Sequence, residues 1–276
     1  AKQLACTVIG FRDVARAQVF YLPGTNMNGV LKTSDERNNL WLFLAARGVT
    51  VFTLDYRTRF VGADFNGDLS FMRDWTFARF VMDAQNAVLQ IKSTSAAVPL
   101  YVAGFSRGVS YAYALAGQVD VAGLIALDGS FKDISPKPYD LAAALAKYDK
   151  EGIFASSLSR RGYNARHELM RRAYEAPDGP AIDDRYETAA DQLAQTLHRA
   201  WGSGALANTQ ENISALSVLA REMDQFDWFF PTIQDVESRV HRSQSNYPGM
   251  DLDDHFGRMT IPIVYFGSTD MGTDAL

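Results

Sequence analysis

The chain has 276 residues, of which 47% are hydrophobic and 21% are charged, and its formal net charge is −5. This is the composition of an ordinary globular protein, and it excludes a disordered or fibrous chain. The acidic balance also disfavours nonspecific nucleic-acid binding, which depends on basic patches that contact phosphates.

The single cysteine, Cys6, excludes an internal disulfide and a zinc site built from several thiolates. No run of about 18 apolar residues is present, so we expect a soluble chain without a membrane-spanning helix. The sequence begins at Ala1 without the pattern of a signal peptide. A cytoplasmic location and secretion after removal of a leader therefore both stay open.

In the first half of the chain, short apolar runs alternate with amphipathic stretches. Buried strands are predicted at residues 18–23, 49–54, 100–104 and 121–127, and helices at 34–47, 74–92 and 109–117. Near-continuous apolar strands joined by amphipathic helices indicate an α/β fold with a mostly parallel, doubly wound sheet. Residues 5–11 are expected to add an antiparallel edge strand.

This alternation stops after Phe131, and strand character returns only at residues 261–266. The stretch between them contains several helical patterns and no convincing buried strand. Long insertions into surface connections cost little closure entropy. We therefore predict a core at 1–130 and 256–276 and an inserted helical cap or lid at 131–255.

The strongest chemical signal is Gly104-Phe105-Ser106-Arg107-Gly108, which follows a predicted strand and precedes a predicted helix. A nucleophilic serine requires this context, because a sharp strand-to-helix turn lifts its hydroxyl clear of the sheet. Glycines two positions to either side allow the strand and the helix to approach each other. The alternative is a chance pair of glycines around a helix-capping serine.

A second signal is the Gly- and Asn-rich loop at residues 22–29, directly after the first buried strand. Acyl transfer needs two N–H donors that face the developing oxyanion. The first candidate donor is the amide of Arg107, after the serine, and the second is the amide of Thr25 or Asn26. The alternative is an ordinary turn.

Together, the Gly-Phe-Ser-Arg-Gly pentapeptide, the Pro-Gly-Thr-Asn loop and the late strand resemble the α/β-hydrolase fold family, in particular its serine esterases and lipases with a large helical cap. The resemblance covers about residues 1–130 and 256–276. It implies a catalytic triad in the chain order serine, acid, histidine. Asp270, which follows the late strand, is the implied acid, and Asp128, at the end of the preceding strand, is the alternative.

The family places the triad histidine after the acid, but in this sequence no histidine follows Asp270. The family's last strand and helix are missing as well. We therefore expect the chain to be truncated or processed, with a companion polypeptide that completes the fold and supplies the histidine. Among the histidines present, His241 in the insertion is the nearest substitute, whereas His255 is expected at the far end of the sheet.

The resulting expectation is a serine hydrolase that cleaves a small-molecule carboxylic ester through an acyl-enzyme, without a metal or another cofactor. One alternative is a catalytically silent ligand-binding protein on the same fold. Another is one chain of a processed two-chain hydrolase that acts on amides or thioesters. Aromatic residues near the end of the insertion, among them Phe229 and Phe230, suggest either an apolar substrate pocket or simple packing.

Overall fold

The computed structural model describes residues 5–10, 15–33, 35–62, 64–95, 97–130, 160–201, 216–234, 236–238 and 259–267, together with the isolated positions 142 and 146. For residues 160–166 and 197–201 it describes the backbone alone. The chain divides into two units. Unit 1 comprises Ala1–Val30, Trp41–Ser157 and Asp227–Leu276, and unit 2 comprises Leu31–Leu40 and Leu158–Phe226.

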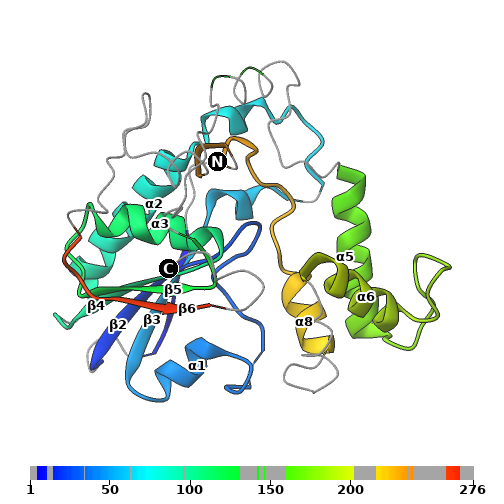
Figure 1. The fold of residues 1–276 in the computed structure, drawn as a ribbon, viewed down its shortest axis with the longest axis horizontal. Coiled ribbons are helices and arrows are strands. Elements are labelled where there is room, and N and C mark those ends of the chain that lie inside the picture. The colour runs from blue at the N-terminus through cyan, green and yellow to red at the C-terminus, as the bar shows by residue number, and fades with distance from the viewer. Residues whose placement is uncertain are drawn as a thin grey trace. The chain divides into compact units, whose positions relative to one another are not determined.

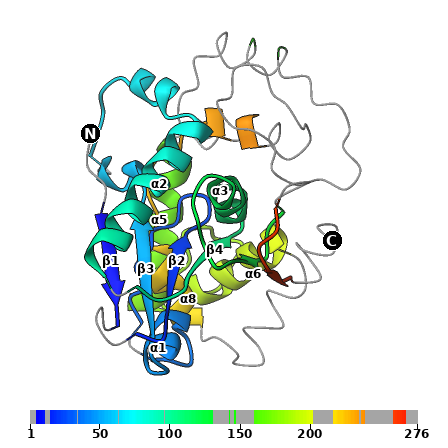
Figure 2. The ribbon, with the colours of Figure 1, turned by 90° about the vertical axis from the view of Figure 1, so that its left-hand side faces the viewer.

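Unit 1 is built on a six-stranded sheet with the order β1-β3-β2-β4-β5-β6 (Figure 1). The strands are β1 (Ala5–Ile9), β2 (Ala17–Leu22), β3 (Val49–Asp55), β4 (Leu100–Phe105), β5 (Gly123–Leu127) and β6 (Ile263–Phe266). β1 pairs antiparallel with β3, and the other neighbours are parallel. Figure 2 shows the first four of these strands side by side. The predicted mostly parallel sheet is thus confirmed, including its antiparallel edge strand.

Helices cover both faces of this sheet, and the alternation of side chains along β2 shows how. Phe20 and Leu22 belong to the large buried cluster that also includes residues of α2 (Phe77–Thr94) and α3 (Arg107–Ala116). Tyr21 points to the other face, where its ring lies 4.2 Å from that of Trp41 in α1 (Leu40–Ala45). Successive strand residues face opposite sides of a sheet, so a strand buried on both faces is apolar throughout.

The helix α2 forms because its apolar residues recur on one stripe. Phe77, Val81, Ala84 and Val88 are all fully buried, as expected for steps of three and four residues. Thr76 caps the helix, and its side chain accepts a hydrogen bond from the amide of Arg79. The helix spans nearly the range that its periodicity predicts.

The predicted helix at 34–47 is shorter in the structure and begins only at Leu40. Asp35 accounts for the difference, because its carboxylate accepts hydrogen bonds from the Arg37 amide, at 3.0 Å, and from the Arg37 guanidinium. Such local side-chain bonds offer the backbone an alternative to the helix. At the other end, the helix stops at Ala45, and Gly48 follows with a φ of 78°, a left-handed conformation that is common after a helix C-terminus.

Unit 2 is helical in its described part. Its helices are α5 (Arg160–Glu175), α6 (Ala189–Trp201) and α8 (Leu216–Met223). They pack around a small apolar cluster that includes Leu169, Leu193 and Met223. The carboxylate of Glu222 also binds the backbone of the same unit, accepting hydrogen bonds from the amides of Lys32 (2.9 Å) and Thr33 (2.7 Å).

The predicted boundaries of the insertion, 131–255, remain a prediction, because much of that range lies outside the described residues. Within it, residues 158–226 fall in unit 2, whereas residues 227–238 belong to unit 1. None of the described helices combines the length and the apolar character needed to cross a membrane.

Candidate active site

Ser106 occupies the corner between β4 and α3. Its backbone has φ 51° and ψ −122°, a region that residues other than glycine rarely adopt. Its amide donates to the carbonyl oxygen of Leu127 at 3.0 Å, and its own carbonyl oxygen accepts from the amide of Val109 at 3.0 Å. The corner is therefore strained and is fixed by hydrogen bonds to β5 and to the first turn of α3.

Glycines surround this corner because there is no room for side chains. A Cβ atom on Gly104 would overlap the backbone of Gly108, and a Cβ atom on Gly108 would overlap the carbonyl oxygen of Leu22. A Cβ atom on Gly129, after β5, would overlap the backbone of Ser106 itself. The two glycines of the pentapeptide thus have the packing role that their spacing predicts.

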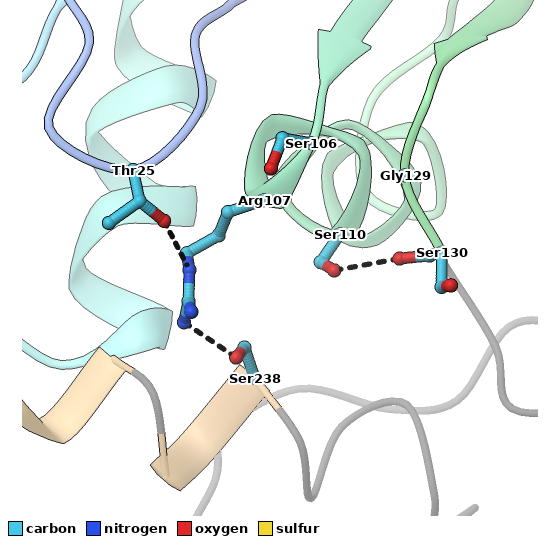
Figure 3. Close-up of a pocket in the computed structure, with 7 residues that line it drawn as sticks. All are labelled: Thr25, Ser106, Arg107, Ser110, Gly129, Ser130 and Ser238. Atoms are coloured by element: carbon cyan, nitrogen blue, oxygen red, sulfur yellow. Dashed lines mark hydrogen bonds between the residues drawn. The ribbon is translucent and has the colours of Figure 1, made fainter. Parts of the chain in front are cut away.

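A pocket of about 290 Å³ opens beside Ser106 (Figure 3). Its lining residues are Thr25, Ser106, Arg107, Ser110, Gly129, Ser130 and Ser238. Ser106 is partly exposed there, and its hydroxyl forms no hydrogen bond with any residue that the structure describes. The geometry leaves this hydroxyl accessible to a bound molecule.

The loop after β2 packs directly against the serine corner. It contains a turn in which the amide of Met27 donates to the carbonyl oxygen of Gly24 at 3.2 Å, and Asn26 has a φ of 62°. A positive φ at the third residue is typical of a type II turn. A Cβ atom on Gly24 would lie 3.2 Å from the Cβ of Ser106, so glycine permits this close approach.

Asp227 holds the same loop from the other side. Its amide donates to the carbonyl oxygen of Asn26 at 2.6 Å, and the Asn26 side-chain amide donates to the carbonyl oxygen of Asp227 at 3.0 Å. Both residues are buried, with 2% and 5% of their surfaces exposed, respectively. Asn26, at its positive φ, is thereby fixed by two hydrogen bonds to the backbone of Asp227.

The carboxyl group of Asp227 is buried. Thr58 donates a hydrogen bond to one of its oxygens at 2.6 Å, while the other, Oδ1, has no partner among the described residues. Burial raises the pKa of Asp227 to about 8, against the lowering effects of the Thr58 hydrogen bond and the Arg59 charge. We therefore expect this carboxyl group to be protonated at neutral pH.

Arg107, next to Ser106, ties three segments of the pocket wall together (Figure 3). Its guanidinium donates to Thr25 Oγ1 at 2.9 Å, to the carbonyl oxygen of Gln234 at 2.6 Å and to Ser238 Oγ at 2.7 Å. Gln234 is itself buried and accepts a hydrogen bond from the Tyr111 hydroxyl of α3 at 2.7 Å. The segment 234–238 is thus anchored both to α3 and to the residue after the expected nucleophile.

Of the site residues predicted from the sequence, the structure brings Ser106, Arg107 and Thr25 together around one pocket. Asn26 lies beside them but does not line the pocket. Asp128 directly follows β5, has a φ of 48°, and donates a hydrogen bond from its amide to the carbonyl oxygen of Phe266 at 2.7 Å.

Other predictions stay untested. Asp128 is not a lining residue, and its role as a triad acid remains a prediction. Asp270, His241 and His255 lie outside the described residues. His167 lies in unit 2, where its Nδ1 atom is 3.5 Å from Asp224 Oδ1.

Several residues of the site were not found from the sequence. Ser110 lies four residues after Ser106, so the shared helix face was a usable signal. Asp227, Gln234 and Ser238 carried no signal, because their contacts lie far away in the chain. The nearby aromatic residues Phe229 and Phe230 are buried in the core of unit 1 rather than in the pocket lining.

Comparisons with known proteins agree with this fold. This chain is similar to the crystal structure of a candidate lipase from Sulfolobus solfataricus, with 25% sequence identity and a TM-score of 0.73. The match covers 94% of this chain and 73% of the lipase chain. The chain has the α/β-hydrolase fold. Two other solved structures are more distant. MenH from S. aureus has 12% identity and a TM-score of 0.44, with 94% of this chain and 78% of that chain covered. An α/β hydrolase from Sphaerobacter thermophilus has 13% identity and a TM-score of 0.44, with 95% and 77% covered.

No family profile matches the sequence, and no curated protein matches it. The structural comparisons nevertheless support a hydrolase in general terms. Within the described ranges, no group of three or more His, Cys, Asp or Glu side chains is arranged to hold a metal ion.

The backbone strain at Ser106 predicts an unusual order of stability for two substitutions of this residue. Ser106→Ala keeps a Cβ atom at a positive φ, whereas Ser106→Gly removes it. We expect the glycine variant to be more stable by about 1 kcal/mol or more. The strained backbone costs roughly 1–3 kcal/mol, and the larger conformational entropy that glycine loses on folding offsets only part of the relief. Denaturant unfolding of both variants measures the difference, and equal or reversed stabilities would show that the corner is unstrained.

The buried carboxyl of Asp227 predicts a pH dependence of stability. Its pKa is raised from 3.8 to about 8, so between these values the folded chain keeps a proton that the unfolded chain has released. Rising pH therefore disfavours folding, by at most about 1.4 kcal/mol per pH unit. Asp227→Asn mimics the protonated group and removes this penalty.

We expect the Asp227→Asn variant to gain in melting temperature relative to the parent chain as the pH rises from 5 to 8. Glu237, whose pKa burial raises to about 7, acts in the same direction in both proteins and cancels in the difference. Identical pH profiles of the two proteins would contradict the assignment of a buried, protonated Asp227.

Proposed function

We propose that this chain is a serine hydrolase that cleaves a carboxylic ester through an acyl-enzyme, with Ser106 as the nucleophile. The observation that carries the proposal is the position of Ser106: a serine held at positive φ between a strand and a helix, with its hydroxyl at a pocket. This is the geometry that a nucleophile elbow requires. The similarity to the candidate lipase supports the choice of an ester.

In the first step, Ser106 Oγ forms a bond to the ester carbonyl carbon while its proton passes to a base. The alcohol then leaves with a proton, and the acyl group stays on the serine. In the second step, water attacks the acyl-enzyme and releases the acid, which frees Ser106 for another cycle.

The oxyanion that forms in each step is proposed to bind the backbone amides of Arg107 and Thr25. Arg107 is the first residue of α3, so its amide belongs to the positive end of that helix. The amide of Thr25 donates to no acceptor among the described residues, and Thr25 lines the pocket. Thr25 is favoured over Asn26 because Thr25 is among the described lining residues of the pocket and Asn26 is not.

The base is proposed to be a histidine outside the described residues, supplied by a companion segment or by His241. Asp270 is the proposed acid that orients it and stabilises its charged form, with Asp128 as the alternative. Asp128 has one point in its favour, because it lies directly after β5 and next to Gly129, whose backbone packs on Ser106.

The test is hydrolysis of a panel of activated esters by the full chain and by Ser106→Ala. Loss of the nucleophile is expected to lower kcat/KM by at least about a thousandfold. Ser93→Ala, at the exposed end of α2, is the matched control and should keep the parent rate. Unchanged turnover by Ser106→Ala would end the proposal.

A further inference from the structure

The described residues that line the pocket beside Ser106 are almost all polar. Apart from Gly129, every lining residue in the described part of the chain carries a hydroxyl or a guanidinium group. The lining hydroxyls belong to Thr25, Ser106, Ser110, Ser130 and Ser238. A site built to hold a hydrocarbon chain is lined mainly by apolar and aromatic side chains, whereas the described lining of this pocket includes no aliphatic or aromatic residue.

The hydrogen bonds of these hydroxyls leave both donors and acceptors available to a bound molecule. Ser110 donates its proton to the carbonyl oxygen of Ser130 at 3.0 Å, which leaves the lone pairs of its oxygen as acceptors. Thr25 accepts from Arg107, so its own proton remains a donor. The side-chain hydroxyl of Ser130 has no partner among the described residues.

The aromatic residues Phe229 and Phe230, which the sequence offered as an apolar pocket lining, lie in the core instead. Phe230 is 1% exposed, and its ring lies 6.3 Å from that of Phe80 on α2. Phe229 is also buried and contacts Phe65, at 6.4 Å between ring centres. Both residues therefore support the core of unit 1, and the expectation of an apolar or aromatic substrate pocket built from them loses its basis.

We propose that the acyl group accepted by this site is short and carries a hydroxyl or a similar hydrogen-bonding group near its carbonyl. This inference rests on the proposed esterase function. The ester carbonyl must contact Ser106, Thr25 and Arg107 at once, and all three line this pocket. One substituent of that carbonyl therefore enters the same space, and the inference assigns this space to the acyl group.

Two physical effects favour a short polar acyl group over a fatty one. A hydrocarbon chain would remove water from the hydroxyls without replacing its hydrogen bonds, and unpaired polar groups are costly to bury. The volume of about 290 Å³ also lies at the lower limit of ligand pockets, which span roughly 300–1,000 Å³. A hydroxylated acyl group restores the lost hydrogen bonds and fits the space.

The test compares three aryl esters with the same leaving group: hydroxyacetyl, propanoyl and octanoyl. The first two differ mainly by a hydroxyl in place of a methyl group. Each kcat/KM is divided by the rate of hydroxide-catalysed hydrolysis of the same ester, which removes intrinsic reactivity. We expect the corrected value for hydroxyacetyl to exceed that for propanoyl by about tenfold or more, with octanoyl the poorest substrate.

Ser130→Ala locates the preference. Loss of one hydrogen bond is expected to lower the hydroxyacetyl-to-propanoyl ratio about three- to tenfold, whereas Ser93→Ala should leave the ratio unchanged. Ser130 is partly exposed, so the variant is expected to fold, and circular dichroism checks this.

The outcomes separate this inference from the proposed function. An octanoyl or propanoyl preference would overturn the inference while the esterase assignment stands. A ratio unaffected by Ser130→Ala would place the selectivity outside this pocket and overturn the inference as well. Failure to cleave any of the esters would overturn the proposed function and the inference together.

Discussion

The site depends on one strained corner of the backbone. Ser106 is held in a conformation that costs roughly 1–3 kcal/mol, and it persists because its surroundings leave no alternative. β4 and α3, on either side of it, are almost entirely buried. At Gly104, Gly108 and Gly129, backbone lies against backbone without space for a side chain. The packing of the core thus stabilises a geometry that the serine alone would not adopt.

A second constraint comes from the segment 227–238, which belongs to unit 1 although it follows the helices of unit 2 in the chain. Asp227 fixes the loop at Asn26, and Gln234 and Ser238 bind the guanidinium of Arg107. Pieces of chain separated by more than a hundred residues therefore define one pocket. The short loop that is proposed to bind the oxyanion is fixed by this segment as well as by the sheet.

The sheet and the serine corner could be predicted from the sequence because their signals are local. Apolar runs mark the strands, and the spacing of Gly104, Ser106 and Gly108 marks the corner. The late start of α1 was missed because the side chain of Asp35 competes with the helix for backbone hydrogen bonds. The hydroxyls of the pocket wall were missed because Ser130 and Ser238 acquire their roles only through tertiary contacts.

The same distinction explains why the aromatic residues near 229 were ambiguous. An aromatic run is compatible with a pocket or with a core, and composition does not separate the two. Burial of Phe229 and Phe230 in unit 1 decides for the core. Because these rings do not line the pocket, the hydroxyl and guanidinium groups of its described lining residues are the features that indicate the class of substrate.

The most direct test of the central claim is covalent labelling of the folded full chain with an alkyl fluorophosphonate. Attack by an activated serine forms a bond from oxygen to phosphorus and releases fluoride. The account predicts a single adduct by intact mass, located at Ser106 by peptide mapping and absent from Ser106→Ala. A folded chain that forms no adduct, or one labelled at another serine such as Ser110, would contradict it.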